Sequence, residues 1–233
     1  MLSVRDVTIT REGLPIVRGA NLDVEAGEIT VLLGVNGAGK TTLLEGISGA
    51  IPLAAGEVRL GGERIDRRPP FARARAGLAH VEQGRTIIPE LTTRENLVVA
   101  AGGDELETAF TMFPSLRRRA DVAAGLLSGG EQQMLVLSRA LLRHPRVLLV
   151  DELSLGLAPK VLDELMATVA ELGRQGMAIM LVEQFAHLAL AIGSRAYVLR
   201  GGEIVHSGRC AELRDDPELL QRLYLGDRAE VVA

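Results

Sequence analysis

The stretch GVNGAGKT, residues 34–41, follows directly on the apolar run ITVLL. Its pattern, G-x-x-x-x-G-K-[S/T], lets consecutive backbone N–H groups turn inward around a phosphate chain, and glycine is needed because a Cβ atom would block the close approach. The chain has 24 arginines and only two lysines, one of which is Lys40. A compact ammonium fits such a loop where the wide arginine fork would not. The sequence therefore predicts a strand, a phosphate-binding loop and a helix opening at Thr41.

The positive end of that helix would point at the phosphates, and the Thr41 hydroxyl is suited to Mg²⁺. We expect the nucleotide to be held by seven consecutive residues, which are Asn36, Gly37, Ala38, Gly39, Lys40, Thr41 and Thr42.

A second pattern is LLVDE, residues 148–152, an apolar strand that ends in two acids. Asp151 is placed to hold the shell of a Mg²⁺ ion, and Glu152 is placed to orient or deprotonate an attacking water. A pair of solvated acids after a strand would look the same in isolation. The preceding glycine loop favours the functional interpretation.

A third pattern is LSGGEQQ, residues 127–133. Ser128 and Glu131 form the pattern of a capping box at the start of the helix EQQMLVLSRALL. A capped helix start that contains Gly129 and Gly130 is also an exposed anion site, so both interpretations can hold.

Composition limits the class of protein. The chain has 233 residues, 47% hydrophobic residues and a formal net charge of -4, which argue for a globular protein and against a general nucleic-acid binder. No apolar run reaches the roughly 18 to 20 residues that span a bilayer, and the N-terminus is charged where a signal peptide would be apolar. We therefore expect a cytosolic chain whose membrane connection, if any, runs through a partner.

The order of secondary-structure elements can be predicted from the periodicity of hydrophobic residues and from the glycines that mark turns. Residues 1–30 and GEVRLGGERI indicate an antiparallel β region, and the spacing of apolar residues from Thr86 to about Arg143 is helical. RVLLVDE and AIMLVEQ look like parallel strands around a crossover helix. AYVLRGGEIVHSG predicts a closing hairpin. We expect one domain over 1–233, with 1–85 and 146–233 forming the core and β subdomain and 86–145 a helical subdomain.

GVNGAGKT, LSGGEQQ and LLVDE, in this order, resemble the motifs of the ATP-binding cassette (ABC) family over essentially the whole chain. The resemblance implies an α/β fold with a P-loop NTPase (RecA-like) core, an antiparallel β subdomain and an inserted helical subdomain. It also implies ATP and Mg²⁺ as ligands and a head-to-tail dimer, with a second cassette or with itself. Ser128, Gly129, Gly130 and Glu131 would then close over the nucleotide of the partner copy. Gln83 falls where the family has a glutamine that ligates Mg²⁺ or water.

Several stretches are similar to the ATPase subunits of branched-chain amino-acid importers: QGRTIIPELTTRENL, LVDELSLGLAP, LVEQFAHLALAIGSRAYVLRGGEIVHSG and LYLGD. This similarity implies two integral-membrane permease subunits, a solute-binding protein acting indirectly, and a peripheral position on the cytoplasmic face of the cell membrane. ATPases for urea or short amides resemble the same stretches, and Gln83, where branched-chain subunits often have glutamate, leans toward the urea type.

The chain departs from the family pattern at four positions. Arg11 stands where many cassettes stack an aromatic ring on adenine, and Gln184 replaces the switch histidine, so that it can donate a hydrogen bond but carry no proton. Leu153 replaces the usual proline, and Ala158 replaces an aspartate of the loop that signals across the dimer.

Two other classes of protein stay open. A soluble cassette ATPase of DNA repair or translation would usually carry a second cassette, long coiled coils or zinc cysteines, none of which this sequence has. Arg11 and Gln184 leave room for a regulatory module without turnover, but Lys40, Asp151 and Glu152 weigh against it. They favour an active ATPase, whose catalytic groups would be Lys40, Gln83, Glu152 and Gln184.

Overall fold

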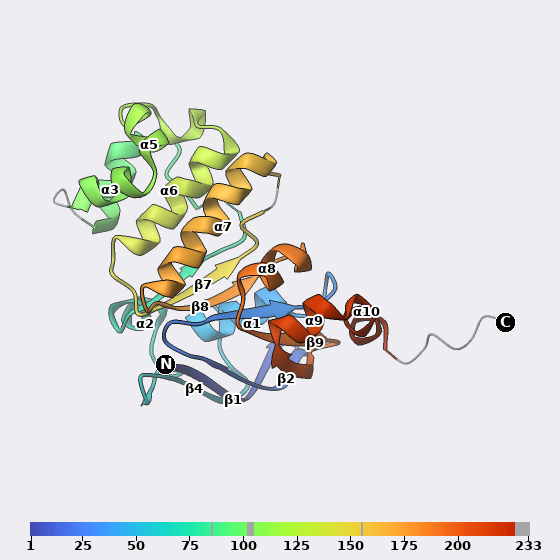
Figure 1. Ribbon diagram of the computed structural model, residues 1–233. Coiled ribbons are helices and arrows are strands. Elements are labelled where there is room, and N and C mark those ends of the chain that lie inside the picture. The colour runs from blue at the N-terminus through green and yellow to red at the C-terminus, as the bar shows by residue number, and fades with distance from the viewer. Residues whose placement is uncertain (85, 102–104, 155, 227–233) are drawn as a thin grey trace.

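The structure is a computed structural model that describes residues 1–84, 86–101, 105–154 and 156–226 (Figure 1). Three of the stretches quoted above each include one residue outside these ranges, namely Arg85, Leu155 and Asp227.

Two sheets organise the described residues. An antiparallel sheet has the strand order β2-β1-β4-β5, and a six-stranded sheet has the order β10-β9-β3-β8-β7-β6. The strand bounds are β1 Leu2–Arg11, β2 Leu14–Val24, β3 Ile29–Leu33, β4 Ala55–Leu60, β5 Glu63–Arg64, β6 Leu78–Val81, β7 Val147–Asp151, β8 Ala178–Val182, β9 Arg195–Arg200 and β10 Glu203–Arg209.

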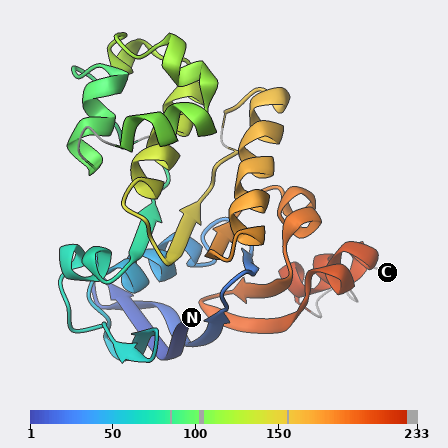
Figure 2. The same ribbon diagram turned by 60° about the vertical axis from the view of Figure 1, so that its left-hand side comes forward.

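Helices cover the six-stranded sheet and form a separate cluster at one end of the molecule. Their bounds are α1 Lys40–Ser48, α2 Pro70–Arg75, α3 Thr93–Ala101, α4 Leu106–Met112, α5 Pro114–Arg118, α6 Gly129–Leu141, α7 Pro159–Arg174, α8 Ala186–Ile192, α9 Cys210–Asp215 and α10 Pro217–Leu225. Figure 2 shows the green helices α3, α4, α5 and α6 at one end and the blue antiparallel strands at the other.

The six-stranded sheet separates two hydrophobic cores. Strands β3, β7 and β8 are buried at every residue, as expected for parallel strands covered on both faces. Because successive side chains of a strand point to opposite faces, Leu148 and Val150 enter the core shared with the helical cluster, whereas Leu149 enters the core shared with the antiparallel sheet. This central sheet is thus anchored on both sides, and the loops at its edge are held by it.

The fold class predicted from the sequence is confirmed. RVLLVDE and AIMLVEQ contain the parallel neighbours β7 and β8, AYVLRGGEIVHSG forms the antiparallel pair β9 and β10, and GEVRLGGERI forms β4 and β5. The helix after the phosphate loop begins at Lys40, one residue earlier than predicted, because Gly39 provides the N-cap. The subdomain boundaries at residues 85 and 145 remain a prediction.

His80 on β6 gives the fold a pH dependence. Burial lowers the pKa of His80 from 6.5 to about 4, and its Nδ1 lies 3.1 Å from the Ser48 hydroxyl. A depressed pKa means that the stabilising preference for neutral histidine is complete above pH 6.5 and is lost as the pH falls toward 4. We expect the free energy of unfolding to fall over this window by up to about 3 kcal/mol more in the wild type than in His80→Asn. Urea unfolding at several pH values measures it, and equal pH slopes in the two proteins would contradict the prediction.

Candidate functional site

The site forms where four parallel strands end. The phosphate loop follows β3, Gln83 lies two residues after β6, Glu152 directly follows β7, and Gln184 lies two residues after β8. Parallel strands of one sheet end at a common edge, which is where such sheets place their ligand sites. The topology therefore brings together residues that are far apart in the sequence.

The phosphate loop has the backbone that its glycines predict. Gly39 has φ of 107°, in the left-handed region, and a Cβ atom at Gly34 would lie 2.3 Å from the Leu199 carbonyl oxygen. Helix α1 has no side-chain N-cap and no acidic residue in its first turn. Its N-terminal amides thus face the loop, and no carboxylate of the helix's own first turn competes for them, which suits an anion.

Lys40 lies at the centre of the loop. Its Nζ donates to the carbonyl oxygens of Gly34, at 2.8 Å, and of Val35, at 3.2 Å. Burial lowers the pKa of the Lys40 ammonium, and the negative charges of Glu152 and Asp151 oppose that shift. The ammonium is therefore held on the loop by its own backbone, next to the two acids that end β7.

Asp151 has the environment expected of a metal ligand. Its side chain is 1% exposed, and neither carboxylate oxygen has a hydrogen-bond partner of normal length among the described residues. Burial raises the pKa of Asp151 to about 6, and the nearby Thr41 hydroxyl and Lys40 ammonium partly offset the rise. Two buried oxygens with no hydrogen-bond partner of normal length among the described residues, beside a threonine hydroxyl, fit an oxygen-ligated divalent cation such as Mg²⁺.

Glu152 and Gln83 contact each other. The Gln83 Nε2 donates to Oε2 of Glu152 at 2.8 Å, across 69 positions of sequence. Glu152 has φ of 52°, and its backbone N–H donates to the Val182 carbonyl at 2.9 Å. The carboxylate is thus oriented by an amide from another strand end, as an acid that positions a water would need to be.

A pocket of about 500 Å³ joins these groups. Of the residues predicted from the sequence, it is lined by Arg11, Asn36, Gly37, Gly39, Lys40, Thr41, Thr42, Gln83, Glu152 and Gln184. Asp151 and Ala38 are buried and do not line it.

Arg11 forms part of the pocket wall in a restrained position. Its Nε donates to the Thr42 hydroxyl at 3.2 Å, and its guanidinium forms an ion pair with Glu45 on helix α1. Ile16 on β2 also lines the pocket and was not among the residues predicted from the sequence. The β1–β2 hairpin, in which Arg11 pairs with Leu14, carries Ile16 to the pocket, and Ile16 belongs to no sequence motif.

The LSGGEQQ stretch lies away from this pocket. The capping box is present: the Ser128 hydroxyl accepts from the Glu131 N–H at 3.3 Å, and Glu131 accepts from the Ser128 N–H at 2.9 Å. Arg119 pairs with the same carboxylate at 3.1 Å. None of Ser128, Gly129, Gly130 and Glu131 lines the pocket. Within one chain, the structure does not bring this stretch to the phosphate loop.

Comparison with known proteins gives a consistent result. The family model described as ABC transporter matches residues 17–154. The chain is 38% identical to a high-affinity branched-chain amino acid transport ATP-binding protein of Pseudomonas aeruginosa, BraG, over 97% of this chain and 100% of that protein. It is 35% identical to a probable branched-chain amino acid transport ATP-binding protein of Archaeoglobus fulgidus, LivF, over 91% of this chain and 93% of that protein.

Solved structures agree on the fold. A nucleotide-free ATP-binding cassette from an ABC transporter superposes with a TM-score of 0.86, at 24% identity, over 97% of this chain and 99% of that one. Among the described residues, no helix combines the length and apolar character needed to cross a membrane.

Proposed function

The chain belongs to the ABC transporter family and is one of its ATP-hydrolysing cassettes, and we propose that it energises the uptake of branched-chain amino acids through membrane permease partners. The observation that carries the proposal is the pocket in which Lys40, Gln83 and Glu152 meet, in a chain that matches a branched-chain transport ATPase along almost its whole length.

The reaction is transfer of the terminal phosphoryl group of ATP to water, which forms ADP and phosphate. Such transfer passes through a loose transition state, so positioning and charge neutralisation supply nearly all the catalysis. Lys40 and the first amides of α1 neutralise phosphate charge. Glu152, held by the Gln83 amide, orients the attacking water and accepts its proton, and Gln184 donates a hydrogen bond to the terminal phosphate.

Mg²⁺ would be held by Asp151, Thr41 and Gln83. Bound there, it would neutralise negative charge on the phosphate oxygens. The two carboxylate oxygens of Asp151, which have no hydrogen-bond partner of normal length in the part of the chain that the structure describes, support this assignment.

A head-to-tail dimer completes the site in this proposal. Ser128 and the amides of Gly129 and Gly130 come from the partner copy, because within one chain they lie away from the pocket. Arg11 and Ile16 form the wall on which the base would rest, with the guanidinium plane fixed by Glu45. Gln184, which cannot carry a proton, makes proton transfer the task of Glu152 alone.

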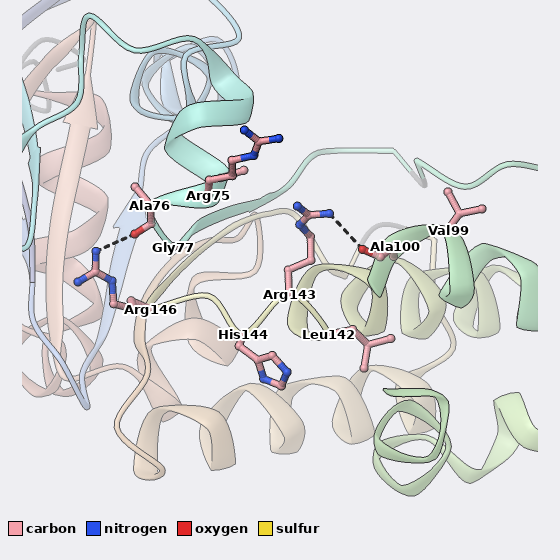
Figure 3. A pocket seen from close by; sticks show the side chains of 10 residues that line it. Arg75, Ala76, Gly77, Val99, Ala100, Leu142, Arg143, His144 and Arg146 are labelled. Carbon is pink, nitrogen blue, oxygen red and sulfur yellow. Dashed lines mark hydrogen bonds between the residues drawn. The ribbon is translucent and has the colours of Figure 1, made fainter. Parts of the chain in front are cut away.

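For the permease contact we propose the cleft in Figure 3, which lies between α2, α3 and the end of α6 and has a volume of about 810 Å³. Arg75 and Arg143 line it, and Arg143 donates to the Ala100 carbonyl at 3.1 Å. Val99 on α3 is 59% exposed there, and no acidic residue is among the lining residues that the structure describes. A segment with one apolar anchor and acidic or polar flanks would fit this surface. The chain itself would sit peripherally on the cytoplasmic face of the membrane.

The test is purification of the tagged chain from native membranes in mild detergent. We expect two multi-span proteins and a second cassette to co-purify, and leucine-like solutes with their binding protein to stimulate ATP hydrolysis. The multi-span proteins should no longer co-purify with the Val99→Asp variant. They should still co-purify with Leu225→Asp, which changes a 64% exposed leucine on α10.

Other outcomes point to other functions. Stimulation of ATP hydrolysis by urea or short amides, and not by leucine-like solutes, would identify urea or a short amide as the transported solute. Recovery without membrane proteins, or with nucleic acid, would contradict the transport role, and absence of ATP hydrolysis in the assembled complex would favour a regulatory module.

A further inference from the structure

Glu183, next to Gln184, is a buried carboxylate that the mechanism above does not use. It follows β8 directly and is 1% exposed. Its Oε1 accepts from the backbone N–H of Leu153 at 2.8 Å and of Ser154 at 3.2 Å, and its Oε2 accepts from the Ser154 hydroxyl. A buried charge is costly unless its oxygens are hydrogen-bonded, and here three donors meet it.

Those donors belong to the two residues that directly follow Glu152. Leu153 and Ser154 are themselves 1% and 4% exposed, so the segment is closed off from water. On the other side, the Glu152 N–H is held by the Val182 carbonyl. The backbone of Glu152, in the left-handed region that costs about 1 kcal/mol or more for a residue with a side chain, is therefore fixed before and after its Cα by the end of β8.

We propose that Glu183 is a positioning residue for ATP hydrolysis, which holds the segment 153–154 through three hydrogen bonds and thereby aims the Glu152 carboxylate into the pocket. The proposal rests on the proposed function of Glu152. Two neighbouring residues then have different roles: Gln184 lines the pocket, and Glu183 holds the segment that follows β7.

Leu153 has a part in this arrangement. A proline at this position would have no N–H, and the 2.8 Å bond to Glu183 could not form. In this chain the departure from proline thus supplies the shortest backbone donor to the buried acid.

The sharpest test compares Glu183→Ala with Glu183→Gln. Glutamine keeps every bond: its Oε1 accepts from both backbone N–H groups, and its Nε2 donates to the Ser154 oxygen. We expect the alanine variant to lower kcat by about 10-fold or more, with the KM for ATP within about two-fold, because only the orientation of Glu152 is lost. The glutamine variant should stay within about three-fold of the wild type.

A matched variant separates positioning from loss of stability. Leu165→Ala removes a fully buried side chain of α7 that does not line the pocket, so it should lower the melting temperature and leave kcat within about two-fold. A kcat for Glu183→Ala no lower than that of Leu165→Ala would overturn the proposal. So would a glutamine variant as slow as the alanine variant, since charge and not hydrogen bonding would then matter.

Amide hydrogen exchange gives a readout that does not depend on turnover. Exchange at Leu153 and Ser154 should be about 10-fold faster in Glu183→Ala and unchanged in Glu183→Gln. A wild-type protein without ATPase activity would contradict the proposed function, whereas unchanged protection of these two amides in the alanine variant would contradict the role of Glu183 whatever the activity.

Discussion

Glu152→Gln is expected to lower kcat for ATP hydrolysis about 100- to 1,000-fold while MgATP still binds. The glutamine side chain has the same shape and can still accept from the Gln83 amide, but it cannot take a proton from the attacking water. Steady-state turnover gives kcat, and titration of a fluorescent ATP analogue gives the affinity. The variant should also accumulate as a dimer in MgATP, which size-exclusion chromatography detects.

Glu203→Gln is the matched control, because it removes an exposed acid of β10 outside the pocket. Its turnover should equal that of the wild type. Unchanged turnover in Glu152→Gln would remove Glu152 from the catalytic role, and loss of ATP binding would show that the residue holds the nucleotide instead.

Asp151→Asn is expected to have two opposite effects. Turnover in Mg²⁺ should fall about 100-fold or more, because the substitution removes the one negatively charged ligand proposed for the cation. Without nucleotide, the variant should be about 1–3 kcal/mol more stable than the wild type at pH 7.5, because the wild type there buries a carboxylate whose oxygens lack donors among the described residues. Urea unfolding in the absence of nucleotide and metal measures the second effect.

The sign of this effect follows from the pKa. Burial raises the pKa of Asp151 to about 6, so its contribution to stability is complete below its unfolded pKa of 3.8 and is lost as the pH rises through 6. The increase in unfolding free energy caused by Asp151→Asn should therefore be smaller at pH 4 than at pH 7.5. Asp163→Asn, at an exposed acid of α7, should change stability by less than about 0.5 kcal/mol at either pH. A destabilised Asp151→Asn at pH 7.5 would show that the ionised carboxylate stabilises the fold.

Local patterns account for most of what could be predicted about the fold. ITVLL, LLVDE and AIMLVEQ are short apolar runs beside glycines or acids, and each forms a fully buried strand. The N-terminal cap of α6 could also be predicted from the sequence, since Ser128 and Glu131 are only three positions apart. Such features depend on neighbours in sequence, where side-chain spacing and backbone geometry are constrained by the chain itself.

Contacts between the ends of different strands could not be predicted from local sequence patterns. The bond from Gln83 to Glu152 spans 69 positions, and the bonds from Leu153 and Ser154 to Glu183 span 30 and 29. Ile16 and Glu183 carry no motif, so their roles come only from the register of the sheets that surround them.

The sequence by itself determined the phosphate loop, the two acids that end β7 and the capped start of α6, because each is a pattern over eight residues or fewer whose chemistry follows from residue type. Only the tertiary structure decided which of these meet. The parallel order β3-β8-β7-β6 aligns four strand ends at one edge, which joins Lys40, Gln83, Glu152 and Gln184 around one pocket, and it leaves the LSGGEQQ stretch on the helical cluster, where a single chain cannot bring it to the phosphates.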